Sequence, residues 1–106
     1  MGQYQAKPLV DEDLIRAAGW IKQDNPEAAE RFLNAAFHSF EFLGRYPEAG
    51  PKCRFGQARL KDVRFWVLPP PFNKWIVFYR IESDTVCILR VLYGAQNWRD
   101  EPESFL

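Results

Sequence analysis

Two apolar runs near the C-terminal end of the chain constrain the fold most strongly. Residues 75–81 and 85–93 are rich in β-branched and aromatic side chains, and the polar residues 82–84 separate them. This pattern is typical of a β-hairpin. Neither run alternates between apolar and polar residues, which predicts two central strands in a sheet that is covered on both faces.

Two arginines, Arg80 and Arg90, interrupt these apolar runs. An arginine in a central strand needs either a carboxylate partner or an opening to solvent. Two interpretations stay open. The arginines pair with carboxylates such as Asp11, Asp13 or Glu82 and hold a helix to the sheet, or they bind a phosphate or carboxylate group of a partner.

The N-terminal part of the chain predicts a short strand and a first helix. Residues 4–9 form the strand, with Pro8 at its end or at the sheet edge. The acidic residues 11–13 suit the first turn of a helix, because they complement its dipole. Apolar residues then recur at helical spacing, so we expect this helix to run to about residue 22.

A second helix begins at Asn25, where a capping side chain is followed by a proline at the first helical position. Gly44 is expected to end it. Residues 58–68 then predict a strand that bends around Asp62, and the proline run at 69–71 connects it to the hairpin.

The element order is therefore β-α-α-β-β-β. We expect an α+β fold with an antiparallel sheet and an N-terminal helical hairpin packed on one of its faces. The 106 residues predict a single domain over 1–106 with one hydrophobic core. No apolar run is long enough to span a membrane, and the first residues do not resemble a signal peptide, so we expect a cytoplasmic protein.

The two cysteines do not indicate a disulfide or a metal site. Cys87 falls inside a predicted central strand, where it is expected to act as a small apolar residue. Cys53 falls in a loop and has no neighbouring ligand residues. We expect no metal and no organic cofactor.

The net charge is zero, but the charges are unevenly distributed. Residues 59–90 contain six basic and three acidic residues, whereas residues 91–106 contain one arginine and three acidic residues. The predicted sheet is therefore locally basic and the C-terminal tail acidic. A local basic patch can attract an anionic partner even when the whole protein is neutral.

An ordered set of short motifs resembles the RelE/ParE superfamily of bacterial toxins, and in particular its ParE-like, plasmid-stabilisation branch. The motifs are DL at 13–14, NPEAA at 25–29, RF at 31–32, LGRYPEAG at 43–50, Arg59, IVFYRI at 76–81 and ILRVLYGAQ at 88–96. The resemblance implies the toxin of a type II toxin–antitoxin pair, neutralised by a cognate antitoxin with which it forms an oligomer. ParE-like members inhibit DNA gyrase, whereas RelE-like members cleave mRNA on the ribosome.

One departure from the RelE-like pattern favours the gyrase inhibitor. Gln96 stands where RelE-like toxins tend to carry arginine, and a neutral amide cannot stabilise a phosphorane as a guanidinium can. We therefore expect no catalytic residue; if the protein is a nuclease, the candidates are Arg59, Arg90 and Tyr93. A ribosome-dependent nuclease and a non-toxic binding module of the same fold remain the alternatives.

The expected contacts are made with proteins, without sequence-specific binding of nucleic acid. A basic sheet surface is expected to meet an acidic, amphipathic antitoxin. Phe72 and Trp75 flank the proline loop and are expected to form an exposed apolar anchor. Residues 98–106 are a candidate contact with the target, by resemblance. The predicted partner-binding residues are Arg59, Arg64, Arg80, Arg90, Phe72, Trp75 and Trp98.

Overall fold

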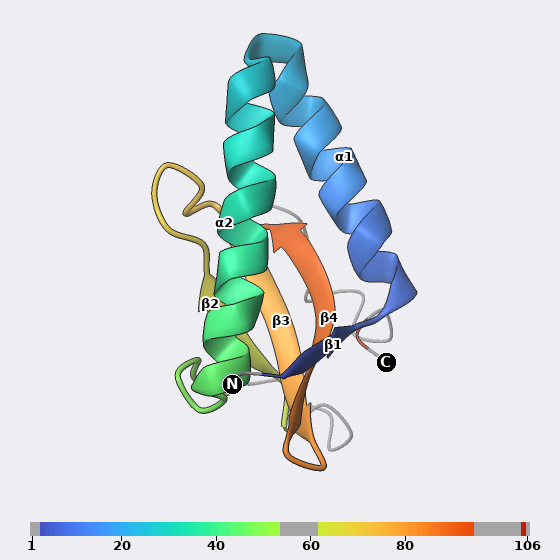
Figure 1. Ribbon diagram of the computed structural model, residues 1–106, viewed down its shortest axis with the longest axis vertical. Helices are drawn as coiled ribbons and strands as arrows, with labels where there is room; N and C mark the ends of the chain where they lie inside the picture. The colour runs from blue at the N-terminus through green and yellow to red at the C-terminus, as the bar shows by residue number, and fades with distance from the viewer. Residues whose placement is uncertain (1–2, 54–61, 95–104, 106) are drawn as a thin grey trace.

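The computed structural model describes residues 3–53, 62–94 and 105. Their helices and strands are, in chain order, β1 (Tyr4–Ala6), α1 (Pro8–Asp24), α2 (Pro26–Arg45), β2 (Arg64–Val67), β3 (Trp75–Glu82) and β4 (Thr85–Tyr93) (Figure 1). The predicted α+β class and the order β-α-α-β-β-β are confirmed. Of the strand predicted over residues 58–68, the four residues of β2 are seen as strand, and residues 58–61 lie outside the described part.

The strands form one sheet in the order β1-β4-β3-β2. The hairpin strands β3 and β4 are its central strands, as predicted. β2 and β4 both pair antiparallel with β3, but β1 runs parallel to β4. The sheet is therefore mixed rather than wholly antiparallel. Because some eighty residues separate β1 from β4, no tight turn sets their relative direction.

Helix α1 begins earlier than its acidic residues predict. Lys7 is the N-cap residue and Pro8 occupies the first turn, so the strand predicted over residues 4–9 ends at Ala6. A proline suits this position because the first helical N–H groups have no partner inside the helix. The N-H of Lys7 donates to the carbonyl oxygen of Ile88 at 3.0 Å, and this bond marks the end of the β1–β4 pairing.

The second helix begins where predicted, and α1 continues two residues past its expected end at about residue 22, to Asp24. The side chain of Asn25 accepts hydrogen bonds from the N-H groups of Glu27 and Ala28, at 3.1 and 3.2 Å. The other end of α2 differs from the prediction, because the helix continues past Gly44 to Arg45. A Cβ atom at Gly44 would stand 2.9 Å from the nitrogen of Gln3, so glycine is required there by the close approach of the N-terminal segment.

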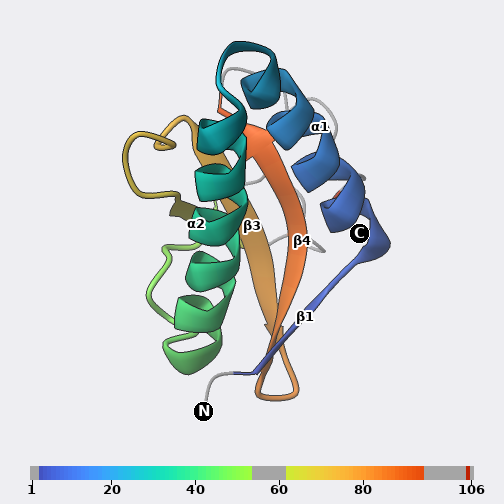
Figure 2. The ribbon, with the colours of Figure 1, turned by 45° about the horizontal axis from the view of Figure 1, so that its top comes forward.

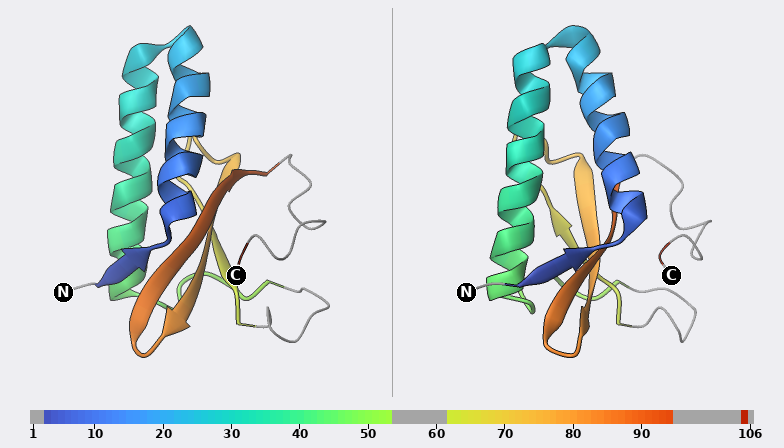
Figure 3. Two further views of the ribbon diagram at one scale, coloured as in Figure 1. Left: turned by 90° about the vertical axis from the view of Figure 1, so that its right-hand side faces the viewer. Right: turned by 45° about the vertical axis from the view of Figure 1, so that its right-hand side comes forward.

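Apolar side chains cover both faces of the sheet, as the lack of alternation predicts. On one face the helical hairpin packs over β3 and β4 (Figures 2 and 3). Phe32 and Phe40 of α2 are fully buried there. On the other face Phe105 packs edge-to-face against Phe78, with their ring centroids 4.8 Å apart.

Cys53 and Cys87 also lie in the apolar cluster on that second face, where both are buried and neither forms a disulfide. Burial raises the pKa of the Cys87 thiol, and the nearby Glu82 carboxylate adds to this effect. For Cys87 this is the role of a small apolar residue that the sequence predicts, whereas the burial of Cys53, predicted only to lie in a loop, is seen in the structure alone.

A buried tyrosine of β3 fixes the loop that follows α2. The hydroxyl of Tyr79 donates to the carbonyl oxygen of Pro47 at 2.6 Å and accepts from the N-H of Gly50 at 2.9 Å. Arg64 donates to the carbonyl oxygen of Gly50 at 2.7 Å. The loop is thus held to the sheet by side chains of two neighbouring strands.

The buried hydroxyl of Tyr79 predicts a loss of stability at alkaline pH. Burial raises the pKa of Tyr79 above its usual value of 10.0, although the bonds to Gly50 and Arg64 oppose the shift. Above that pH the unfolded chain releases this proton while the folded protein retains it, so the free energy of unfolding falls as pH rises. Urea unfolding from about pH 9 to 11 measures the fall. We expect a smaller fall for Tyr79→Phe; an equal fall in both proteins would contradict the assignment.

Candidate partner-binding site

Arg90 is held by a buried carboxylate of α1. Its Nε and Nη2 atoms donate to the two oxygens of Asp13, both at 2.8 Å. One of these oxygens also accepts the N-H of Val91 at 3.0 Å. The side chains of Arg90 and Asp13 are only 12% and 2% exposed. The structure therefore supports the first of the two interpretations of Arg90: it pairs with a carboxylate and joins a helix to the sheet.

The two other arginines of the described strands lie on opposite faces of the sheet. Arg64 is paired with Tyr79 across β2 and β3, so its side chain lies on the helix-covered face. Arg80 follows Tyr79 directly in β3 and lies on the opposite face, with its Nη1 3.9 Å from an oxygen of Glu82.

The three described arginines of the predicted basic surface, Arg64, Arg80 and Arg90, therefore do not share one face. Strand alternation separates Arg64 from Arg80, and Asp13 holds Arg90 against α1. Two further predicted contact residues, Arg59 and Trp98, lie outside the described residues.

The expected apolar anchor is also only partly present. Phe72 is buried, and its ring packs edge-to-face on Phe32 with the centroids 5.5 Å apart. The proline loop folds Phe72 inward, so the prediction that it is exposed is wrong. Trp75 is half-buried, between Phe32 at 5.3 Å and Tyr93 at 5.1 Å.

Trp75 and Tyr93 line a pocket of about 350 Å³ between α1 and the end of β4, which we call the α1–β4 pocket. Arg16 and Trp20 line it from α1, one helical turn apart. Trp20 is 68% exposed. The pocket has the size of a small-ligand site, and its tryptophans, tyrosine and arginine are the residue types most enriched in the energetic centres of protein interfaces.

Sequence analysis missed Arg16 and Trp20. The signal available was the position of Trp20 outside the apolar spacing of Leu14, Ala17 and Ile21, which predicts an exposed tryptophan. Its association with Trp75 could not be inferred, because it depends on how α1 lies on the sheet.

The chemistry of the α1–β4 pocket suits binding. Its described lining residues include no cysteine, serine, threonine or histidine, and the one carboxylate, that of Asp13, is already bonded to Arg90.

Within the described ranges, no group of three potential ligand residues could hold a metal ion. Among the same residues, neither helix combines the length and apolar character that crossing a bilayer requires.

Comparison with known protein families gives a match over most of the chain. The sequence model of the family described as "ParE toxin of type II toxin-antitoxin system, parDE" matches residues 4–98, which include all the described helices and strands. No curated protein matches the chain.

Proposed function

This chain belongs to the ParE toxin family of type II toxin–antitoxin systems, and on that basis we propose that it stops growth by binding DNA gyrase in the cytoplasm. A toxin of this family implies an antitoxin partner. In the proposal, the cognate antitoxin neutralises the protein, and the pair acts in plasmid stabilisation.

The bond between Arg90 and Asp13 is the observation that carries the choice of an inhibitor over a nuclease. Cleavage of RNA by its own 2′-hydroxyl requires cations that hold the phosphate as negative charge develops. Of the two arginines that the sequence offers as nuclease candidates, Arg90 is the one in the described part of the chain. Both of its hydrogen bonds to Asp13 are short, so its guanidinium is already engaged. Releasing it would leave the Asp13 carboxylate buried without its partner, which is costly.

The α1–β4 pocket is the proposed contact with the target. It lies where β4 ends at Tyr93, and the chain continues from there into the segment that the resemblance associates with toxicity. Trp20 and Trp75 offer large apolar area, and Arg16 offers a cation at the rim. A few side chains of this kind usually carry most of the binding energy of a protein interface.

Controlled expression in a bacterial host tests the proposed activity. Plasmid topology and primer extension on abundant mRNAs are measured in the same cells. Relaxed plasmid with intact mRNA is the expected result. Cuts in mRNA at codon spacing would instead make the protein a nuclease, and undisturbed growth in a host without the antitoxin would identify a non-toxic binding module.

Truncation of Trp20 tests the contact with the target. We expect Trp20→Ala to reduce gyrase inhibition in a supercoiling assay by about 30-fold, which corresponds to the loss of about 2 kcal/mol at the centre of an interface. Stability should change little, because the side chain is mostly exposed. Ile15→Ala is the matched control, since Ile15 is 72% exposed on the same helix and does not line the pocket. Equal inhibition by both variants would place the contact elsewhere.

A further inference from the structure

The floor of the α1–β4 pocket is made of small apolar side chains. Ala17 of α1 and Val91 of β4 line it, and both are buried. Arg16 and Trp20 lie on either side of Ala17 along the helix and also line the pocket. An alanine between these two long side chains leaves a recess that a larger residue would fill.

The aromatic wall of the pocket is held in place by packing. Trp75 and Tyr93 are paired across the β3–β4 hairpin, and their rings meet edge-to-face with the centroids 5.1 Å apart. Trp75 also meets the ring of Phe32 edge-to-face at 5.3 Å, and Phe32 is fully buried in the core. A wall that is fixed in advance loses little side-chain entropy when a ligand binds.

Trp20 stands at the mouth of the pocket, where it is 68% exposed. Its ring can stack on a ligand ring or meet it edge-to-face. The pocket volume of about 350 Å³ lies near the lower end of the range for small-molecule sites, roughly 300–1,000 Å³. The pocket therefore suits a ligand of one or two rings.

The charges of the pocket favour an anionic ligand. The carboxylate of Asp13 is engaged by Arg90 and by the N-H of Val91, so it is not available to a cation. Arg16 is exposed, and no carboxylate of the described residues stands within ion-pair distance of it. A guanidinium can donate two parallel hydrogen bonds to a carboxylate. The ligand that fits is an aromatic ring that carries a carboxylate.

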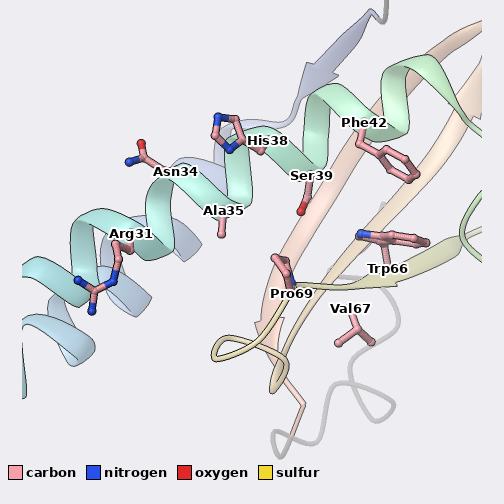
Figure 4. Close-up of a pocket in the computed structure, with 9 residues that line it drawn as sticks. All are labelled: Arg31, Asn34, Ala35, His38, Ser39, Phe42, Trp66, Val67 and Pro69. Carbon is pink, nitrogen blue, oxygen red and sulfur yellow. The ribbon is translucent and has the colours of Figure 1, made fainter.

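A second surface, the α2–β2 groove, arranges similar residues differently (Figure 4). Its lining includes Arg31 and Phe42 of α2 and Trp66 of β2. From Arg31 to Phe42 the helix rises about 16 Å, which is farther than one small ligand spans. The rings of Phe42 and Trp66 lie 5.2 Å apart, too close for a ligand ring to enter between them. In the α1–β4 pocket, by contrast, Arg16 and Trp20 are one helical turn apart.

We propose that the α1–β4 pocket is a binding site for a small aromatic carboxylate. The ring of the ligand lies on Ala17 and Val91, against the indoles that line the pocket, and its carboxylate faces Arg16. Binding needs only this chain. One consequence rests on the proposed function: because the same pocket is the proposed contact with gyrase, a bound ligand competes with the target.

Indole-3-acetate is the probe, and indole-3-acetamide and tryptamine are the controls for its charge. All three carry an indole ring and differ in the group that meets Arg16. Titration calorimetry with the full chain should give a dissociation constant of about 0.1–1 mM for indole-3-acetate. The amide should bind about tenfold more weakly, and tryptamine not measurably, because its ammonium group meets a guanidinium. Equal binding of all three would overturn the carboxylate, and no binding of indole-3-acetate would overturn the site.

The indole N-H signals of the tryptophans in NMR spectra locate the bound probe. Each signal is assigned by a Trp→Phe substitution. The signals of Trp20 and Trp75 should shift during the titration, whereas that of Trp66 in the α2–β2 groove should not. A shift of Trp66 as large as those of Trp20 and Trp75 would mean unspecific stacking and overturn the proposal.

Arg16→Gln tests the cation. Because Arg16 is exposed, the variant should fold normally. We expect it to bind indole-3-acetate about tenfold more weakly and indole-3-acetamide unchanged, since only the acid uses the charge. Arg31→Gln, at an exposed arginine of α2 that does not line the pocket, is the matched control and should change neither affinity. Equal weakening of acid and amide by Arg16→Gln would overturn the contact between Arg16 and the carboxylate.

Ala17→Leu tests the recess. The larger side chain fills the floor of the pocket, so both the acid and the amide should lose binding. Thermal unfolding checks that the variant folds, and a folded variant that still binds indole-3-acetate would overturn the recess as the site. If the variant does not fold, Arg16→Gln tests the site independently.

A gyrase supercoiling assay separates this site from the proposed function, with the probe added to gyrase alone as the control. Relief of inhibition by saturating indole-3-acetate supports the competition. Inhibition that persists while the probe is bound would overturn the competition and place the gyrase contact elsewhere. If the protein does not inhibit gyrase at all, the proposed function fails, and calorimetry still decides whether the pocket binds the probe.

Discussion

Asp13→Ala is expected to lower the free energy of unfolding by about 3–5 kcal/mol, the usual cost of removing one partner of a buried ion pair. The carboxylate of Asp13 accepts both bonds of Arg90 and the N-H of Val91. Without it, the guanidinium of Arg90, whose side chain is 12% exposed, loses two short bonds, and the N-H of Val91 loses its bond to this carboxylate. Chemical denaturation measures the loss.

Asp11→Ala is the control for Asp13, because Asp11 is an exposed carboxylate in the first turn of the same helix. Its loss should cost less than about 1 kcal/mol. The double variant Asp13→Leu/Arg90→Met removes both charges, and apolar replacement of both partners is often neutral; any loss that remains reports the bond from the N-H of Val91 to Asp13. If Asp13→Ala costs no more than Asp11→Ala, the pair does not hold α1 to the sheet.

Gly50→Ala is expected to destabilise the protein by about 3 kcal/mol or more, at the upper end of the cost of overpacking. A Cβ atom at Gly50 would stand 2.2 Å from the carbonyl oxygen of Phe65 and 2.8 Å from the hydroxyl of Tyr79. The first of these is backbone and the second is buried, so neither can move away cheaply. The loop would have to leave β2 and break its bonds to Tyr79 and Arg64.

Gly19→Ala is the matched control for Gly50. Gly19 lies inside α1, and a Cβ atom there would meet nothing within 4 Å. Alanine favours a helix interior over glycine by about 1 kcal/mol, so this variant should be more stable than the wild type. Thermal unfolding of the two variants should shift in opposite directions. A shift in the same direction would show that the crowding at Gly50 is relieved by small movements.

Local patterns account for most of the fold. Asn25 and Pro26 mark the boundary between the helices because capping depends on residues that are neighbours in the chain. The hairpin is readable because polar residues separate two apolar runs of strand-forming residues. In the structure Ser83 and Asp84 adopt positive φ, 49° and 66°, as a two-residue hairpin turn requires. The start of α1 was misplaced because Pro8 suits both a strand end and the first turn of a helix.

The candidate site depended on contacts that local patterns do not contain. Sequence reasoning named Trp75 as a partner contact and Tyr93 only as a candidate of the nuclease alternative, and it also named Phe72, which is buried. It did not bring Trp20 to Trp75, because these residues come from an early helix and a late strand. The spacing of apolar residues predicts which positions of a helix are exposed. It does not predict which residue of another element lines the same pocket.

The sequence by itself determined the two helices, the central hairpin and the demand that Arg90 find a partner. All three follow from the spacing of apolar residues and from the cost of burying a charge. Only the tertiary structure decided that the partner is Asp13, that Arg64 and Arg80 lie on opposite faces of the sheet, and that Trp20 and Trp75 line one pocket. Those outcomes depend on how α1 and α2 lie on the sheet, which is set by packing between residues far apart in the chain.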